Sequence, residues 1–199
     1  LAAGRAVDQL RRQLGIILQE DNETPVGACP IEGVTPGLLS ELRARPGSRF
    51  FLLLTAARAR NLGMETDGAK AICLDAQDMT LPDMLALADP LVAGKPPLKT
   101  GFLPATPAQE MLMTLAKYAA LLPAMLVVRS DELPADWLHV SMSDVAAYWN
   151  APELDIVPLT KAALPIAGAE DTTLMCFRER YGTSMHLALI IGDIAKEKN

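Results

Sequence analysis

The chain has 199 residues, of which 50% are hydrophobic, 5% aromatic and 21% charged, and its formal net charge at pH 7 is -6. This length fits one large domain or two small ones, and the composition excludes a disordered tail, a collagen repeat and a coiled coil. The acidic balance gives duplex DNA and anionic lipid no basic surface to bind, so we expect neither nucleic acid nor membrane as a partner.

The targeting signals and the cysteine spacing both indicate a cytoplasmic protein. The longest strongly apolar stretch, residues 118–128, is interrupted by Pro123 and is too short to cross roughly 30 Å of hydrocarbon. The first residues have no apolar core of a signal peptide. The cysteines are an odd number and lie far apart, which fits neither a disulfide framework nor a zinc knuckle. We therefore expect a cytoplasmic protein with reduced, buried thiols at Cys29, Cys73 and Cys176.

The first half of the chain alternates between helix and strand patterns. An apolar stripe of Ala6, Val7, Leu10 and Leu14 predicts a helix from residue 2 that Gly15 ends. Threonines that can cap backbone amides open the later helices, and short apolar runs predict the strands. The expected strands are 16–18, 26–31, 50–54 and 70–75, and the expected helices are 36–44 after Thr35, a short one from Thr55 to Gly63, and 80–88.

The next segments combine a proline-rich connection with a well-marked helix. Residues 90–107 have turn chemistry and predict an extended connection, which is a lid, a partner arm or a plain linker. Thr106-Pro107-Ala108-Gln109 then forms a capping box with proline in the first turn, which predicts a helix over 107–122. A buried strand is expected at 124–128.

From Ser130 the pattern changes. Ser143-Asp144 can cap a helix that Pro152 ends, and strands at 174–178 and 185–191 flank a hairpin-like connection. We place a boundary there: residues 1–130 form a mixed α/β (α+β) layered domain, and residues 131–199 form a connecting helix and a small β-rich segment.

Few residues have a pattern typical of catalysis. The chain has no Gly-x-Ser-x-Gly, Walker, Gly-x-Gly-x-x-Gly or His-Glu-x-x-His motif, and a structural role is expected for His139 and His186. Glu20, Asp21 and Glu23 follow an apolar strand and could bind Mg²⁺ together with Glu110. The alternatives are a solvated loop for the first three and a favourable helix-dipole position for Glu110.

Two arginines form a further candidate site. Arg178 and Arg180 lie two residues apart, so on a strand they share one face and could bind phosphate through both guanidinium groups. The alternative is an ordinary polar face of a sheet.

The order of these signals resembles the 3,4-dihydroxy-2-butanone 4-phosphate synthase family over roughly residues 5–129. The similarity lies in the acidic loop, Glu32-Gly33-Val34-Thr35-Pro36, the strand at 50–54 with Thr55, Arg58 and Leu62-Gly63, and later Leu115-Ala116-Lys117, Leu121 and Pro123-Ala124. The resemblance implies an α/β fold and, in that family, an active site that binds Mg²⁺ and ribulose 5-phosphate.

The motifs that supply this chemistry in the family are degenerate here. In the late Gly-His-Thr-Glu motif, the glutamate matches Glu110, but the threonine falls on Gln109 and the metal-binding histidine on Ala108. In the acidic loop Asp-Arg-Glu-x-Glu-Gly-Asp, the arginine falls on Asp21 and the last aspartate on Val26. Because carbon side chains offer no lone pair to a cation, we expect the scaffold without the synthase reaction and without a metal in this chain.

The end of the chain resembles the opening of GTP cyclohydrolase II. The similar stretches are Phe177-Arg178-Glu179-Arg180-Tyr181-Gly182-Thr183 and the apolar run from His186 to Ile194. The resemblance implies a parent protein that opens the ring of GTP in a riboflavin-type pathway, releasing formate and pyrophosphate. It also implies a homodimer, and a zinc site held by three cysteines beyond Asn199.

Two rival interpretations remain at this point. The chain could be a stand-alone binding or regulatory protein that holds a phosphorylated metabolite with Arg178 and Arg180. It could also retain Mg²⁺-dependent catalysis through Glu20, Asp21, Glu23 and Glu110.

Overall fold

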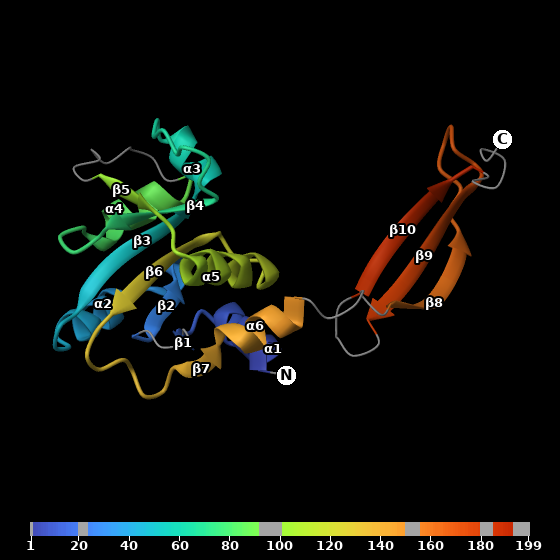
Figure 1. The fold of residues 1–199 in the computed structure, drawn as a ribbon. Helices are drawn as coiled ribbons and strands as arrows, with labels where there is room; N and C mark the ends of the chain where they lie inside the picture. The colour runs from blue at the N-terminus through green and yellow to red at the C-terminus, as the bar shows by residue number, and fades with distance from the viewer. Residues whose placement is uncertain (1, 20–23, 92–100, 150–155, 180–184, 193–199) are drawn as a thin grey trace. The chain divides into compact units, whose positions relative to one another are not determined.

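The computed structural model describes residues 2–19, 24–91, 101–149, 156–179 and 185–192. The chain divides into two units, Leu1–Asn150 and Ala151–Asn199, which are described separately (Figure 1). The division lies later in the chain than the boundary expected at 130/131, and the contacts made by residues 130–149 explain the difference.

Unit 1 is built on a seven-stranded sheet with the order β5-β4-β3-β6-β2-β1-β7. Neighbouring strands are antiparallel except for β1 and β7, which are parallel. The strands are β1 (Ile16–Gln19), β2 (Val26–Pro30), β3 (Arg49–Thr55), β4 (Ala71–Asp75), β5 (Phe102–Pro104), β6 (Ala124–Arg129) and β7 (Leu138–Ser141).

Helices cover both faces of this sheet (Figure 1). One buried cluster joins the sheet to α1 (Ala2–Arg11), α5 (Pro107–Tyr118) and α6 (Met142–Trp149). The other joins it to η1 (Ile31–Gly33), α2 (Pro36–Arg43), α3 (Ala56–Asn61) and α4 (Leu81–Ala88). The predicted layered α/β fold is therefore confirmed, with a core on each side of the sheet.

The helix starts follow the predicted cap chemistry. Four threonine hydroxyls accept hydrogen bonds from backbone amides three residues later, which supplies a partner to an amide that the first turn leaves free. The caps are Thr35, Thr55, Thr80 and Thr106, with donor–acceptor distances of 3.1, 3.1, 3.3 and 3.4 Å.

Two helix ends differ from the prediction. The first helix ends at Arg11 and the chain turns through Gln13 at φ 62°, so Leu14 leaves the apolar stripe and is 47% exposed. Gly15 is therefore not the helix stop; a Cβ at this position would collide with the Trp137 ring. Helix α5 ends at Tyr118 rather than at residue 122, because the backbone turns at Ala120 with φ 57°.

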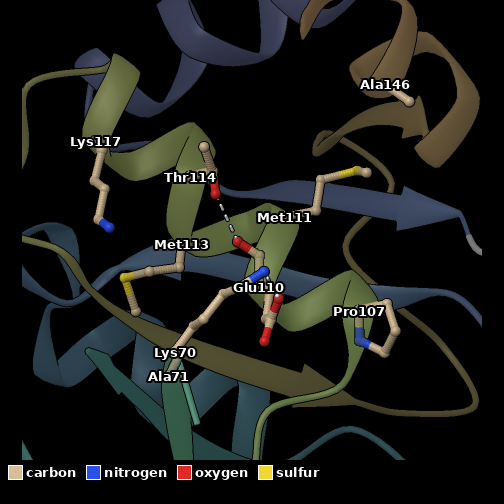
Figure 2. A pocket seen from close by; sticks show the side chains of 9 residues that line it. All are labelled: Lys70, Ala71, Pro107, Glu110, Met111, Met113, Thr114, Lys117 and Ala146. Atoms are coloured by element: carbon tan, nitrogen blue, oxygen red, sulfur yellow. Dashed lines mark hydrogen bonds and ion pairs between the residues drawn. The ribbon is translucent and has the colours of Figure 1, made fainter. Parts of the chain in front are cut away.

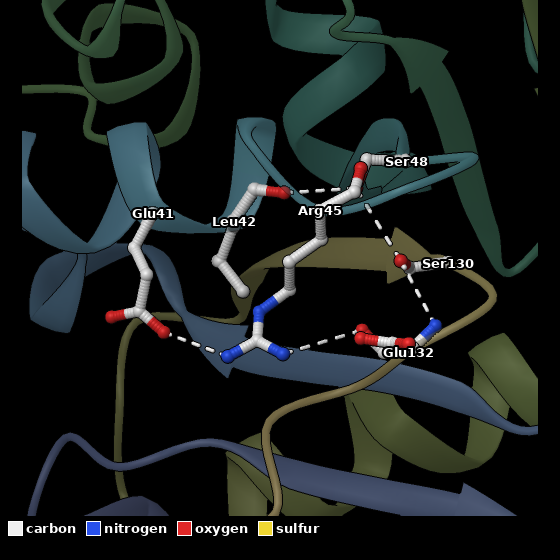
Figure 3. A network of polar contacts seen from close by, with 6 residues as sticks. All are labelled: Glu41, Leu42, Arg45, Ser48, Ser130 and Glu132. Carbon is white, nitrogen blue, oxygen red and sulfur yellow. Dashed lines mark hydrogen bonds and ion pairs between the residues drawn. The ribbon is translucent and has the colours of Figure 1, made fainter.

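A polar network ties the segment after β6 to unit 1 (Figure 3). The Ser48 hydroxyl donates to the carbonyl oxygen of Leu42 at 2.8 Å and lies 3.4 Å from the Ser130 hydroxyl. The Ser130 hydroxyl donates to the carbonyl oxygen of Pro46 at 2.8 Å and accepts from the Glu132 amide at 3.3 Å.

The residues that follow this network add the last strand and helix of unit 1. Strand β7, which the sequence patterns did not predict, pairs with β1 through Leu138 and Ile16. Helix α6 contributes Val145 to the same buried cluster as α1. Residues 131–149 therefore belong to unit 1, which corrects the predicted boundary.

Unit 2 contains an antiparallel sheet in the order β10-β9-β8. Strands β9 (Thr172–Glu179) and β10 (Met185–Ile191) confirm the two predicted strands, whereas β8 (Ile156–Ala163) was not predicted. β8 contains Pro158 and Lys161, and its pairing with β9 shifts register between Pro158 and Thr160. This interrupted pattern gives no clear strand signal in the sequence.

Candidate functional site

The first turn of α5 is the place where the family resemblance expects the reaction chemistry. Its capping box is formed: the Thr106 amide donates to Gln109 Oε1 at 2.9 Å, while Thr106 Oγ1 accepts from the Gln109 amide. The other end of the same side chain is also used, because Gln109 Nε2 donates to Cys73 Sγ at 3.4 Å. Gln109 therefore links the helix start to strand β4, and Ala108 beside it is fully buried.

Cys73 is a protonated thiol at neutral pH. Burial raises its pKa from the ordinary value of 9.0 to about 12, although the Arg129 charge and the hydrogen bond from Gln109 act in the opposite direction. Because the thiolate is the form that attacks electrophiles and binds metals, this cysteine is neither a nucleophile nor a metal ligand as it stands.

Glu110 lies beside a shallow hollow on the outer side of α5 (Figure 2). Its Oε2 atom lies 3.5 Å from Lys70 Nζ, and its backbone carbonyl accepts a hydrogen bond from the Thr114 hydroxyl at 2.9 Å. The hollow has a volume of about 390 Å³ and is lined by Lys70, Ala71, Pro107, Glu110, Met111, Met113, Thr114, Lys117 and Ala146. Its acidic group is therefore paired with a lysine rather than with a second carboxylate.

The structure does not test whether the other predicted site residues lie near Glu110. Glu20, Asp21, Glu23 and Arg180 lie outside the described residues, and Arg178 is exposed on β9 of unit 2. Within the described ranges, no group of three or more His, Cys, Asp or Glu side chains could hold a metal ion. In these ranges, too, no helix is both long and apolar enough to span a bilayer.

The sequence patterns missed a second polar group in unit 1. Arg49 at the start of β3 lies opposite Arg129 at the end of β6, and Arg49 Nη2 lies 3.9 Å from Asp75 Oδ2. Arg129 Nε is buried and has no hydrogen-bond partner. Only the strand register brings these residues together, because they are far apart in the sequence and each one lies singly at a strand end.

Comparison with known proteins adds to this geometry. No family model matches the chain. GTP cyclohydrolase-2 from Azospirillum brasilense is 28% identical over 211 residues, an alignment that covers 96% of this chain and 54% of the relative. The chain is similar to GTP cyclohydrolase-2 along almost its whole length. It spans about half the length of this relative.

Solved structures show the fold. A two-domain 3,4-dihydroxy-2-butanone 4-phosphate synthase from A. baumannii matches with a TM-score of 0.57 and 17% identity, covering 96% of this chain and 70% of that one. A synthase in complex with two magnesium ions matches with a TM-score of 0.57 and 13% identity, over 76% of this chain and 98% of that one. The synthase from Candida albicans matches with a TM-score of 0.54 and 15% identity, over 75% and 98% of the two chains.

The two results agree with both halves of the resemblance expected from the sequence. The chain is GTP cyclohydrolase II-like in sequence and contains a domain with the fold of dihydroxybutanone phosphate synthase.

Proposed function

We propose that unit 1 is a synthase-fold domain without synthase activity, within a GTP cyclohydrolase II-like protein of a riboflavin-type pathway. The longer protein would open the purine ring of GTP with a zinc-activated water and release formate and pyrophosphate, in the cytoplasm and as a homodimer. Unit 1 would pack against the catalytic half, position it or help it to dimerise. The similarity to GTP cyclohydrolase-2 over 96% of the chain supports the parent activity.

The first turn of α5 supports the proposal that unit 1 has no synthase activity. Mg²⁺ prefers oxygen ligands and is usually held by one or two carboxylates. Here Ala108 offers only a buried methyl group, the Gln109 amide is bound to Thr106 and Cys73, and the Glu110 carboxylate lies beside the Lys70 ammonium. The described residues of this turn therefore do not fit a magnesium site.

The cysteines also fail to form a zinc site among the described residues. Cys29 and Cys73 are both buried, but on opposite faces of the sheet. Cys29 belongs to the cluster under α2, α3 and α4, whereas Cys73 accepts a hydrogen bond from Gln109 of α5 on the other face. Cys176 lies in unit 2. We propose that the three zinc-binding cysteines of the longer protein lie beyond Asn199 and that unit 2 forms the first strands of its cyclohydrolase domain.

Two assays test the proposal separately. The 199-residue chain, incubated with ribulose 5-phosphate and Mg²⁺, should release no more formate than a protein-free control, while an active synthase in parallel does. Formate above that control would overturn the inactive assignment. The protein translated from the whole gene should release formate from GTP with zinc and lose this activity with a chelator. A gene without a downstream cysteine set, or a full protein inert toward GTP, would overturn the cyclohydrolase assignment.

A further inference from the structure

Helix α5 buries one face and leaves the opposite face open to solvent. Leu112 and Leu115 belong to the buried cluster between this helix and the sheet. Met111, Thr114 and Tyr118 follow one another at intervals of three and four residues, which places them in one stripe on the other side of the helix. None of these three side chains is fully buried, and Tyr118 is 49% exposed. The stripe therefore faces away from the core of unit 1.

An aromatic pair and the hollow beside α5 extend this open face. The Tyr118 ring meets the Tyr148 ring of α6 edge to face, with the ring centroids 6.5 Å apart and the planes at 76°. These are two of the three tyrosines in the chain, and Tyr148 is 47% exposed. The hollow, lined in part by Met111, Thr114 and Ala146, lies along the same stripe (Figure 2). Exposed aromatic and methionine side chains beside a hollow are typical of protein–protein interfaces.

Two opposite charges flank one edge of this stripe. Glu110 lies in the first turn of α5 and Lys117 in the last turn, which separates them by about 10.5 Å along the helix axis. Successive residues of a helix turn by about 100°, so both charges lie on one side of Thr114, whereas Met111 and Tyr118 lie on its other side. The stripe therefore has a charged edge and an uncharged edge, with Thr114 between them.

Two copies of α5 packed antiparallel, with a two-fold axis beside Thr114, match these features. A rotation of 180° about this axis reverses the helix direction but keeps the charged edges together. Glu110 then faces Lys117 of the second copy, and Met111 faces Tyr118 of the second copy. Each contact occurs twice, as an isologous interface requires. Two parallel helices would instead place each charge against an uncharged side chain, so charge complementarity favours the antiparallel arrangement.

We propose that two copies of this chain associate through the outer face of α5 in this antiparallel arrangement. The inference rests on the homodimer in the proposed function and names the surface that forms it. The hollow beside α5 receives the Tyr118 side chain of the second copy, where the Met111 thioether contacts the ring. Glu110 Oε2 lies 3.5 Å from Lys70 Nζ, but this lysine side chain is 84% exposed, so the ion pair is weak and leaves the carboxylate available to Lys117 of the second copy.

Exchange of the two charges tests this surface in the 199-residue chain, with the dissociation constant of the dimer measured by sedimentation equilibrium. K117E places a carboxylate opposite Glu110 of the second copy and should raise this constant about tenfold or more, because like charges then meet across the interface. E110K/K117E restores opposite charges across the axis and should recover most of the lost affinity. K161E makes the same change of charge at an exposed lysine of β8 and should leave the constant unchanged.

A cysteine on the proposed axis gives a second test that does not depend on charge. In a chain with C176A, T114C places two thiols opposite each other at the axis, within reach of a disulfide. Mild oxidation should then convert the dimer to a covalent one, seen on a non-reducing gel and reversed by a reductant. D78C, at an exposed position between β4 and α4, should not form this product. Cys29 and Cys73 are buried and should not compete for the new thiols.

A chain that sediments as a monomer at every concentration would overturn the proposal, as would T114C that crosslinks no faster than D78C. A dimer that survives K117E but is lost in L187E would place the interface on β10 of unit 2 and would also overturn it. Far-ultraviolet circular dichroism spectra that match the parent chain show that a lost dimer is not a lost fold. Release of formate from GTP by the longer protein is measured separately, so a monomeric chain does not contradict the cyclohydrolase assignment, and an inert longer protein does not contradict the dimer.

Discussion

Every residue of β2 and the first five residues of β6 are buried in unit 1, whereas Met185, Leu187, Leu189 and Ile191 on β10 of unit 2 are between 49% and 67% exposed. Both sheets contain apolar strands, but among the residues that the structure describes helices pack on the two faces of the first sheet alone. A row of exposed apolar side chains on one sheet face is typical of a surface that another protein layer covers. The difference indicates that unit 1 supplies its own core, whereas the described residues of unit 2 leave the apolar side chains of one face of β10 exposed.

A second contrast, within unit 1, lies between its overall fold and the residues at the start of α5. Unit 1 has the fold of dihydroxybutanone phosphate synthase, and at the start of its α5 Ala108 and Gln109 are buried. If unit 1 lacks the synthase reaction, as proposed above, then packing constrains this domain more strongly than the reaction does, because a fold can persist after its site has changed.

Truncation of one leucine in each sheet should give the largest contrast between the units. L52A removes a fully buried side chain of β3 and should lower the free energy of unfolding by roughly 2–5 kcal/mol, because it leaves a cavity. L187A on β10, at a side chain that is 67% exposed, should change it by no more than about 0.5 kcal/mol. Urea titration followed by tryptophan fluorescence reports unit 1, since Trp137 and Trp149 both lie there, and far-ultraviolet circular dichroism reports both units. An L187A loss as large as that of L52A would show that β10 is already covered in solution.

The local parts of the fold could be predicted, and the long-range parts could not. The helix starts followed from Thr35, Thr55, Thr80 and Thr106, since a cap depends on residues three positions apart. Strand β7 was missed because its only buried side chain is Val140 and its stability comes from pairing with β1, far away in the sequence.

The candidate site shows the same limit. The position of Glu110 in the first turn of α5 followed from the capping box, but its ion pair with Lys70 depends on how β4 lies against the helix. The pairing of Arg49 with Arg129 required the strand register, which no short motif reveals.

Substitution of two glycines should separate the loss of stability caused by a steric clash from the loss caused by backbone strain. G15A places a methyl group against the Trp137 ring and should cost roughly 1–3 kcal/mol through overpacking in unit 1, with a change in tryptophan fluorescence. G168A in unit 2 has open space around its new methyl group but keeps a left-handed backbone at φ 82°, so it should cost about 1–2 kcal/mol.

Asparagine at the same positions provides the control. Because asparagine tolerates the left-handed region, G168N should be less destabilising than G168A, whereas the larger side chain should make G15N worse than G15A. Thermal unfolding of the four variants measures this order. If G15N were milder than G15A, the ring of Trp137 would not be what excludes a side chain at residue 15.

The buried thiols of unit 1 should lower the free energy of unfolding of this unit in alkaline solution. The loss per pH unit should be smaller than the losses expected for L52A and the glycine variants. Burial raises the pKa of Cys29 and of Cys73 from 9.0 to about 12. Between these values the unfolded chain loses the proton while the folded chain keeps it, so stability is intact below pH 9 and is lost as the pH rises toward 12, by up to about 1.4 kcal/mol per pH unit for each thiol. Urea titrations at several pH values should show this slope in the parent chain and a smaller one in C29A and in C73A, against C176A as the matched control in unit 2. An unchanged slope in C73A would mean that water reaches this thiol and that burial does not raise its pKa, so the helix start would then be open enough for a ligand to approach it.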